Sequence, residues 1–241
     1  MRPLQILPPL LAGLLTAGCS SWSRPTIRGS GVLTTESRQV SGFDRVSLHG
    51  SGQLTLIQGE EEGLTVETDD NLLPYISSEV RNRQLVVGPE NVSISPTRDI
   101  KYVLRLKQLE SLKLSGSFTV EAASLVAGDL DVDISGSGRI AVGHLAAEST
   151  SLNVSGSGRA TFAGEVVRQR LRISGSGDYE AGELHSQVAD VRISGSGSAT
   201  LWVTEQLDAG ISGSGTVKYY GLPQANQQVS GSGNIRSLGN K

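Results

Sequence analysis

The second half of the chain alternates apolar and polar residues around a tetrapeptide that returns at a nearly fixed interval. Complete copies of Ser-Gly-Ser-Gly follow one another at intervals of 18 to 20 residues, beginning at Ser135, Ser155, Ser174, Ser194, Ser212 and Ser230. A further copy begins at Ser115, with its last glycine replaced by Phe118. Self-similarity at such an interval is typical of a solenoid, in which each repeat buries its apolar face against its neighbours.

The residues beside the tetrapeptide have the period of a β-strand. The residue immediately before it is apolar in every copy: Leu114, Ile134, Val154, Ile173, Ile193, Ile211 and Val229. The position two residues earlier is also apolar except at Gln227, and the residue between the two is polar except at Gly210. A strand with one buried and one solvated face needs this alternation. It resumes after the tetrapeptide, for example at Ile140 and Val142, so each repeat predicts a strand, a glycine-rich turn and a second strand.

These features predict an all-β protein, a parallel β-helix with coils of about 18–21 residues and with the tetrapeptides in a single column. Glycine suits the turn because it adopts positive φ without steric cost, and we expect positive φ at Gly138 and Gly158. Looser copies of the turn occur at residues 29–31 and 50–52. Between Ser51 and Ser115 we expect less regular coils to fill a gap of about three coil lengths.

Residues 1–18 have the pattern of a signal peptide, with Arg2, an apolar stretch over residues 4–15 and small residues before Cys19. Cys19 is the only cysteine, which excludes an intramolecular disulfide. Residues 16–19 resemble the bacterial lipoprotein signal, in which the cysteine after the cleavage point is acylated. We therefore predict lipidation of Cys19, a tether over residues 19–28 and a β-helix domain over residues 29–241, with acyl chains as the membrane attachment. The alternative is an ordinary secretory signal that happens to contain a cysteine.

Composition offers little support for several other classes of protein. The formal net charge is −3 with both signs scattered along the chain, which gives no reason to expect a nucleic-acid partner. The three histidines, His49, His144 and His185, lie at different offsets in the repeat, so we expect neither a metal site nor a cofactor.

The outward positions of the repeat include carboxylates and basic residues, among them Asp131, Asp133, Arg172 and Arg192. Polysaccharide lyases and hydrolases built on parallel β-helices use outward residues of these types, so an enzyme is the alternative function. A catalytic groove usually has walls made by long loops, and these repeats have almost no insertions. We therefore interpret the charges as a solvated face and predict no enzymatic activity.

Trp202 and Tyr220 occupy the same position in successive repeats, eight residues after the start of the tetrapeptide. The alternation places this position outside, so we expect an exposed aromatic pair on adjacent coils, extended by Leu238. Exposed aromatic residues favour contacts with a protein surface or a sugar ring, which makes the pair a candidate partner-binding site. The alternative is that residues 238–241 cover the pair as an end cap.

Three segments taken in order resemble a known family. They are residues 40–46 (Val-Ser-Gly-Phe-Asp-Arg-Val) leading into residues 50–52, then residues 71–76 (Asn-Leu-Leu-Pro-Tyr-Ile), then the tetrapeptide ladder. Over about residues 38–235 the chain is similar to the bacterial envelope family called putative auto-transporter adhesin, head GIN domain. The resemblance implies a right-handed, single-stranded β-helix that is exported to the envelope, with no catalytic residues to carry over.

Together these interpretations predict a non-enzymatic lipoprotein of the bacterial envelope with an adhesive or structural role. The residue after the cysteine is Ser20 and not an aspartate, and this favours sorting to the outer membrane in a bacterium with two membranes. The expected partners are the membrane, through the lipid, and a protein or glycan of the envelope. The face of the outer membrane and the oligomeric state stay open.

Overall fold

The computed structural model of the protein describes residues 25–241. The predicted signal peptide, Cys19 and most of the predicted tether lie outside the described residues. The last three residues of that tether form strand β1 (Thr26–Arg28), which pairs in parallel with β7 (Ser93–Ser95). The folded part of the chain therefore begins before the predicted boundary at residue 29.

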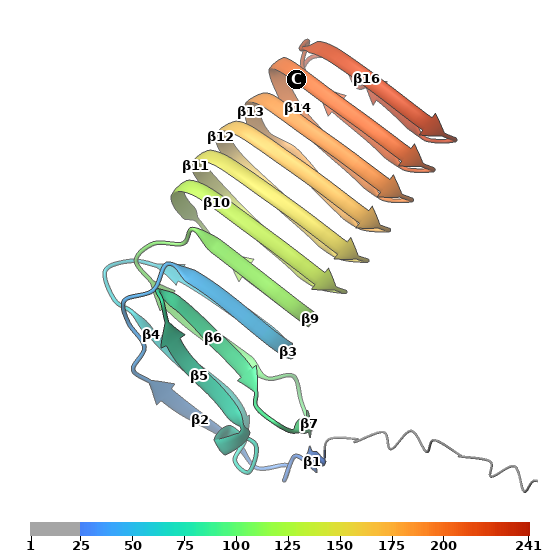
Figure 1. The fold of residues 1–241 in the computed structure, drawn as a ribbon. Helices are drawn as coiled ribbons and strands as arrows, with labels where there is room; N and C mark the ends of the chain where they lie inside the picture. The colour runs from blue at the N-terminus through green and yellow to red at the C-terminus, as the bar shows by residue number, and fades with distance from the viewer. Residues whose placement is uncertain (1–24) are drawn as a thin grey trace, which may run out of the picture.

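Nine strands between residues 111 and 237 build a stack of parallel coils (Figure 1). They are β9 (Ser111–Ala122), β10 (Leu125–Gly136), β11 (Arg139–Gly156), β12 (Arg159–Gly175), β13 (Asp178–Gly195), β14 (Ser198–Gly213), β15 (Thr216–Tyr220), β16 (Gln224–Gly231) and β17 (Asn234–Ser237). β9 to β14 follow one another in chain order, and β15 and β16 both pair with β14. β17 pairs with β15, so β16 and β17 together form the last coil.

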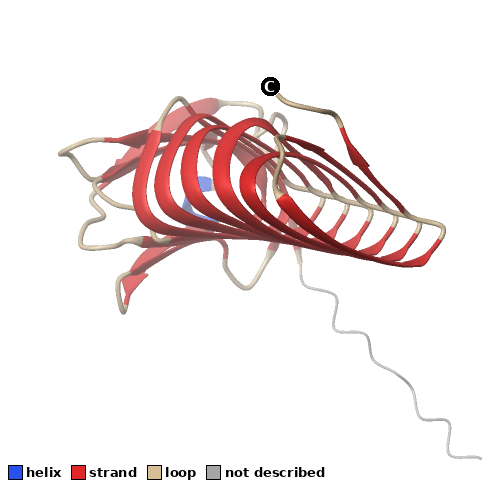
Figure 2. Ribbon diagram, turned by 90° about the horizontal axis from the view of Figure 1, so that it is seen from above, coloured by secondary structure: helices blue, strands red, loops and turns tan. Residues whose placement is uncertain are grey.

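The strand register places each tetrapeptide over its equivalent in the next coil. Ser135 pairs with Ser155 and Gly136 with Gly156, and the same alignment continues through every coil to Gly231. Seen from above, the stacked coils have a similar outline, each displaced slightly from the next, and their turns follow in a row (Figure 2). The predicted all-β parallel solenoid with a single column of turns is confirmed.

The first glycine of the tetrapeptide has positive φ, and the second does not. The φ angles of Gly136 and Gly156 are 124° and 129°. A Cβ on Gly156 would lie 2.5 Å from the carbonyl oxygen of Gly136, so the column requires residues without a side chain. The expectation of positive φ at Gly138 and Gly158 is wrong, because these glycines are needed for packing instead. A Cβ on Gly158 would lie 2.8 Å from Cγ2 of Ile134 in the core.

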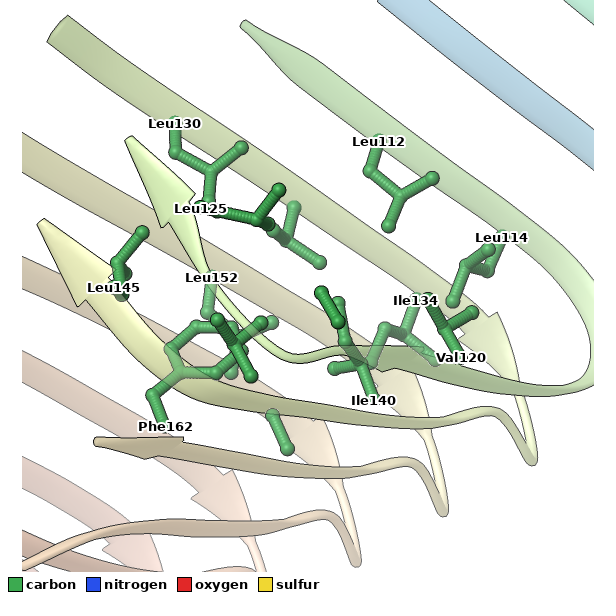
Figure 3. Packing of buried hydrophobic residues seen from close by; sticks show 14 of the residues in the cluster. Leu112, Leu114, Val120, Leu125, Leu130, Ile134, Ile140, Leu145, Leu152 and Phe162 are labelled. Carbon is green, nitrogen blue, oxygen red and sulfur yellow. The ribbon is translucent and has the colours of Figure 1, made fainter. Parts of the chain in front are cut away.

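The inward positions of all coils form one continuous hydrophobic core. Leu114, Ile134 and Val154, which precede the tetrapeptide, are each 1% exposed. Figure 3 shows Leu112, Leu114 and Ile134 pointing between the two walls of the solenoid. Each buried CH₂ contributes about 0.8 kcal/mol, and a coil buries its side chains only when neighbouring coils cover them.

A short chain of hydrogen bonds is also buried inside the solenoid. The Tyr179 hydroxyl donates to Oε1 of Gln169 at 3.1 Å, and Nε2 of Gln169 donates to the Ser186 hydroxyl at 2.6 Å. The Ser186 hydroxyl donates in turn to the carbonyl oxygen of Trp202 at 2.9 Å. Burial raises the pKa of Tyr179 far above its usual range, so the phenol stays a donor. Each of these buried polar groups is thereby satisfied.

The N-terminal part departs from the order of a simple solenoid. β3 (Arg45–Gln58) pairs with β9 on one side and with β6 (Gln84–Pro89) and β8 (Lys101–Leu106) on the other, all in parallel. His49 pairs directly with Ser115, so no coil lies between the turn at residues 50–52 and the first tetrapeptide. The expectation that coils fill this gap in chain order is therefore wrong. After β3 the chain adds strands β6 and β8 on one side of β3, and it then returns to the other side of β3 as β9.

Antiparallel strands cover this end of the stack. β4 (Gly63–Asp69) pairs antiparallel with both β2 (Leu33–Arg38) and β8, and β5 (Ile76–Arg81) pairs antiparallel with β6. A single 3₁₀ turn, Leu73–Tyr75, links β4 to β5. Figure 1 shows these strands at the lower end of the stack, where they continue the same sheet as the regular coils. No helix within residues 25–241 has the length and apolar character needed to span a membrane.

Candidate functional site

The two aromatic residues singled out in the sequence are neighbours on the last coils. β14 and β15 pair with Trp202 directly opposite Tyr220. Both side chains are partly buried, whereas the sequence predicted an exposed pair. The ring of Trp202 also meets the ring of His185 edge-on, with centroids 4.9 Å apart and planes at 79°.

A bulge in β13 brings further polar groups to this pair. Ala181 pairs with Leu201 and His185 pairs with Trp202, so residues 182–184 have no direct partner in β14. The coil that begins at Ser174 is 20 residues long, whereas the next is 18, and this difference in length accounts for the bulge. Gly182 lies beside the Tyr220 ring, since a Cβ on Gly182 would be in van der Waals contact with Cε2 of that ring, at 3.4 Å. Bulges of this kind re-aim side chains and often lie beside functional sites.

The segment after β17 folds back over the aromatic pair. The backbone N–H of Leu238 donates to the carbonyl oxygen of Tyr219 at 2.8 Å, and Leu238 is itself partly buried. The Nζ atom of Lys241 lies 5.2 Å from the ring centroid of Trp202 and 5.2 Å from that of Tyr220. The end-cap alternative thus describes the arrangement in the structure. A role of Trp202 and Tyr220 in partner binding stays a prediction.

Within residues 25–241, several of the charges on the outward face of the coils, although not those of Asp131 and Arg172, form ion pairs with one another. Arg192 contacts both Asp190 and Asp208 at 2.9 Å, and its hydrogen bond with Asp208 raises its pKa. Asp133 accepts a hydrogen bond from Asn153 at 3.0 Å and lies 3.8 Å from Lys113. The contacts with Asp208, Asn153 and Lys113 join successive coils, whereas Asp190 and Arg192 lie on the same strand, β13.

A second set of paired charges lies just after the turns. Asp178 accepts hydrogen bonds from the Ser198 hydroxyl at 2.6 Å and from Arg159 at 2.8 Å, which lower its pKa. The same contact raises the pKa of Arg159. Charge neutralisation between coils is the arrangement expected of a solvated face.

Asp131 lies in two adjacent hollows of the outward face. One has a volume of about 790 Å³ and is bounded by Glu110, Val126 and Asp129, and the other, of about 410 Å³, extends to Arg168 and Arg170. Asp133 lines neither. Strand side chains form most of the walls, together with the short loop between β8 and β9, which lines the larger hollow through residues 108–110. The structure therefore does not bring Asp131 and Asp133 together in one walled groove.

The three histidines lie apart, on β3, β11 and β13. Among the residues that the structure describes, no three histidine, cysteine, aspartate or glutamate side chains are grouped closely enough to bind a metal ion. His49 takes the place of the first serine in the column, opposite Ser115. It borders a hollow of about 420 Å³ with Glu79 and Glu90, which the sequence did not indicate. The apolar Leu48 before His49 repeats the pattern of the tetrapeptide and is the signal that identifies this turn.

Asp69 is a further residue that sequence reasoning missed. Its carboxylate accepts hydrogen bonds from the backbone N–H of Gly31 at 2.7 Å, and from the N–H and hydroxyl of Thr97 at 2.9 and 2.7 Å. The backbone N–H of Thr97 is the largest contribution to a lowered pKa of Asp69. The turn at residues 29–31 is thus held against the end of β4 and is not a coil of the solenoid. This contact is structural, because it connects three distant segments.

The fold and surface define an extended β-solenoid on whose outward face oppositely charged side chains of neighbouring coils form ion pairs. The chain belongs to the family described as putative auto-transporter adhesin, head GIN domain, whose model matches residues 42–223. The resemblance drawn from the sequence is thereby confirmed. An adhesin family indicates a location at the cell envelope or surface.

Solved structures share this fold at low sequence identity. A putative adhesin from Bacteroides fragilis NCTC 9343 superposes with a TM-score of 0.82 at 23% identity, over 88% of this chain and 100% of that one. A putative lipid binding protein from Parabacteroides distasonis ATCC 8503 gives a TM-score of 0.74 at 26% identity, over 88% and 99%. A putative adhesin from Parabacteroides merdae ATCC 43184 gives 0.71 at 22%, over 89% and 99%. No curated protein matches the chain.

Proposed function

We propose that this protein is a non-enzymatic binding module of the bacterial cell envelope, an adhesin or a structural element attached to the outer membrane through an acylated Cys19. The observation that carries the proposal is the family match over residues 42–223, which spans the solenoid from its N-terminal end to β15. The solenoid supports it, since a stack of coils presents an elongated, repetitive surface suited to contact with another surface.

The paired charges of the outward face favour binding over catalysis. A general acid or base needs a proton-accepting or proton-donating group free to meet a substrate. The carboxylates of Asp133, Asp178 and Asp208 are each engaged by a basic or amide side chain of a neighbouring coil. The polysaccharide-active enzyme is therefore the weaker hypothesis.

An adhesion assay tests the function directly. A deletion strain is complemented with wild-type protein or with the Cys19→Ala variant, and its adherence to host cells and to cells of its own kind is measured. We expect adherence to fall on deletion and to return with the wild type only. Unchanged adherence after deletion contradicts the adhesive role.

The lipid attachment has its own measurement. Cells fed an alkyne-labelled fatty acid should label the wild-type protein and leave Cys19→Ala unlabelled. Equal labelling of the two proteins would show that Cys19 is not the acylation site, and the protein would then be secreted by an ordinary signal peptide.

The enzyme alternative is tested with the purified protein and a panel of polysaccharides. The products to look for are new reducing ends or unsaturated sugars. Turnover that disappears when Asp131 and Asp133 are replaced by alanine would establish the enzyme and refute the non-enzymatic function. We expect no turnover with any polysaccharide of the panel.

A further inference from the structure

Three successive coils build a cage around the ammonium group of Lys241. The rings of Trp202 and Tyr220 each have their centroid 5.2 Å from Nζ. Nζ also donates hydrogen bonds to the carbonyl oxygen of Gly182 at 2.7 Å and to Oε1 of Glu183 at 2.5 Å. Aromatic faces attract a cation through their quadrupole, and the two oxygens accept its N–H groups.

The groups that form the cage are held by the solenoid. Trp202 and Tyr220 lie on paired strands, and Gly182 and Glu183 lie in the bulge of β13. The backbone of Trp202 is fixed from inside by the Ser186 hydroxyl, and its ring is fixed by the edge of His185. The cage is therefore preorganised, and a ligand that enters it need not order these side chains.

Lys241 occupies the cage through exposed contacts. The Glu183 side chain is 75% exposed and that of Lys241 is 28% exposed. Exposed ion pairs contribute little to stability, because water and salt compete with them. Beyond Gly239, which accepts a hydrogen bond from the N–H of Gly221 at 2.9 Å, the segment is anchored through this ammonium. An ammonium from another molecule has the same groups available to it once Lys241 moves away.

We propose that the cage is a receptor site for a lysine side chain of a protein partner, with Lys241 as a built-in competitor that fills it when the partner is absent. The inference rests on the proposed binding function and names the ligand class of the Trp202–Tyr220 site. The partner presents its lysine at a surface position. Its ammonium replaces that of Lys241 between the two rings.

The hydrogen bonds of the cage select a primary ammonium. Such a group has three N–H donors and satisfies both Gly182 and Glu183, as Lys241 does. A quaternary ammonium has none and donates to neither acceptor, and the planar guanidinium of arginine directs its donors in a fixed fork. The indole Nε1 of Trp202 is buried and has no acceptor among the described residues. A lysine within a peptide brings carbonyl oxygens that supply one.

Fluorescence of Trp202 provides the test. The chain has two tryptophans, so all proteins carry Trp22→Phe, which leaves Trp202 as the only tryptophan. The full chain and its Lys241→Ala variant are titrated with Nα-acetyl-lysine amide. Tetramethylammonium and the Nε-acetylated amide are the comparison probes. Lys218→Ala, which removes an exposed lysine of β15 outside the cage, is the matched control.

The expected result follows from competition. If Lys241 fills the cage about 80% of the time, the apparent Kd of an added ligand is raised about fivefold. Removing Lys241 lowers the apparent Kd to its intrinsic value. We therefore expect Lys241→Ala to bind Nα-acetyl-lysine amide at least about fivefold more tightly than the wild type or Lys218→Ala. Neither tetramethylammonium nor the Nε-acetylated amide should bind Lys241→Ala as tightly as Nα-acetyl-lysine amide does. Glu183→Gln added to Lys241→Ala should weaken this binding.

Several outcomes overturn the inference. A folded Lys241→Ala variant that gives no saturable change with Nα-acetyl-lysine amide, or that binds tetramethylammonium equally well, shows that the aromatic pair is an end cap without this ligand. If Lys241→Ala fails to fold, Lys241→Met replaces it, and failure of both variants also establishes a structural cap. The adhesion assay of a deletion strain does not depend on this cage, so the two proposals fail separately.

Discussion

Arg192 lies across Gly210, its neighbour on the next coil. A Cβ on Gly210 would be 3.1 Å from Cδ of Arg192, and the guanidinium continues past it to the carbonyl and the carboxylate of Asp208, at 3.1 and 2.9 Å. Gly210 is the one residue that breaks the polar row before the tetrapeptides. Its lack of a side chain is what allows the Arg192 side chain to bridge two coils.

This relationship predicts an energetic coupling between the two residues. Gly210→Val should displace Arg192 and destabilise the wild type by up to about 1 kcal/mol, the range of an exposed ion pair. In an Arg192→Ala background the same substitution should be neutral or stabilising, since valine suits a strand. A double-mutant cycle measured by urea unfolding gives the coupling energy. Additive effects of the two substitutions would contradict the arrangement.

The two glycines of one tetrapeptide should respond differently to alanine. Gly136 has a φ of 124°, and a Cβ there would lie 2.5 Å from the backbone oxygen of Gly116. We expect Gly136→Ala to destabilise the protein by about 2–3 kcal/mol, because positive φ is strained for alanine and a backbone atom cannot move aside. In Gly138→Ala the closest contact of the new Cβ is with a side-chain atom, Cγ2 of Ile134 at 3.0 Å, so this substitution should be tolerated better. Chemical unfolding of both variants compares them, and an equal loss would refute the distinction.

The sequence was sufficient to predict the regular coils because each buried position repeats at a constant offset. Ile134 and Val154 precede successive tetrapeptides and pair in the structure as that spacing requires. The adjacency of Trp202 and Tyr220 follows from the same offset. A period-two pattern does not encode strand direction, however. The antiparallel β4 and the parallel β8 have the same alternation, so the excursion between β3 and β9 looked like additional coils.

The parts of the candidate site that the sequence did not reveal depend on departures from the repeat. The bulge at Gly182 results from one coil that is longer than the next, and the alternation gives no place for its extra residues. The contact of Lys241 with Gly182 joins residues 59 apart in the chain, through a segment that follows the last strand. The hydrogen bonds that Asp69 accepts from Gly31 and Thr97, which form the Asp69 clamp, likewise connect segments that share no repeat.

The Asp69 clamp predicts a specific dependence of stability on pH. The pKa of Asp69 is lowered in the folded protein relative to about 3.9 in an unfolded chain. A carboxylate with a lowered pKa stabilises the fold fully above the unfolded value, and this stabilisation is lost as the pH falls through the folded pKa. Asp69→Asn should therefore be less stable than the wild type near neutral pH, and the difference should shrink below about pH 4.

Urea unfolding at a series of pH values measures this effect, and hydrogen exchange at Gly31 and Thr97 locates it. Glu60→Gln, which removes an exposed carboxylate in the turn after β3, is the control and should show no such trend. A difference between Asp69→Asn and the wild type that stays constant from about pH 6 to pH 3 would mean that the charge of Asp69 does not hold the clamp.

The last coil should be much less stable than the coils below it. Val229 occupies the inward position before the last tetrapeptide but is 46% exposed, whereas Val154, at the same position four coils earlier, is 1% exposed. All eight residues of β16 are exposed, because β16 pairs with β14 on one edge and has no neighbour on the other among the described residues. Val154→Ala should destabilise the protein by about 2 kcal/mol, through lost burial and a cavity. Val229→Ala should change stability by less than about 0.5 kcal/mol.

In hydrogen exchange, the amides of β16 should exchange through local opening far faster than those of β12, since each coil is held by its neighbours. Equal losses for the two valine variants would show that β16 is covered in solution, by a segment or a partner that packs on the end of the solenoid.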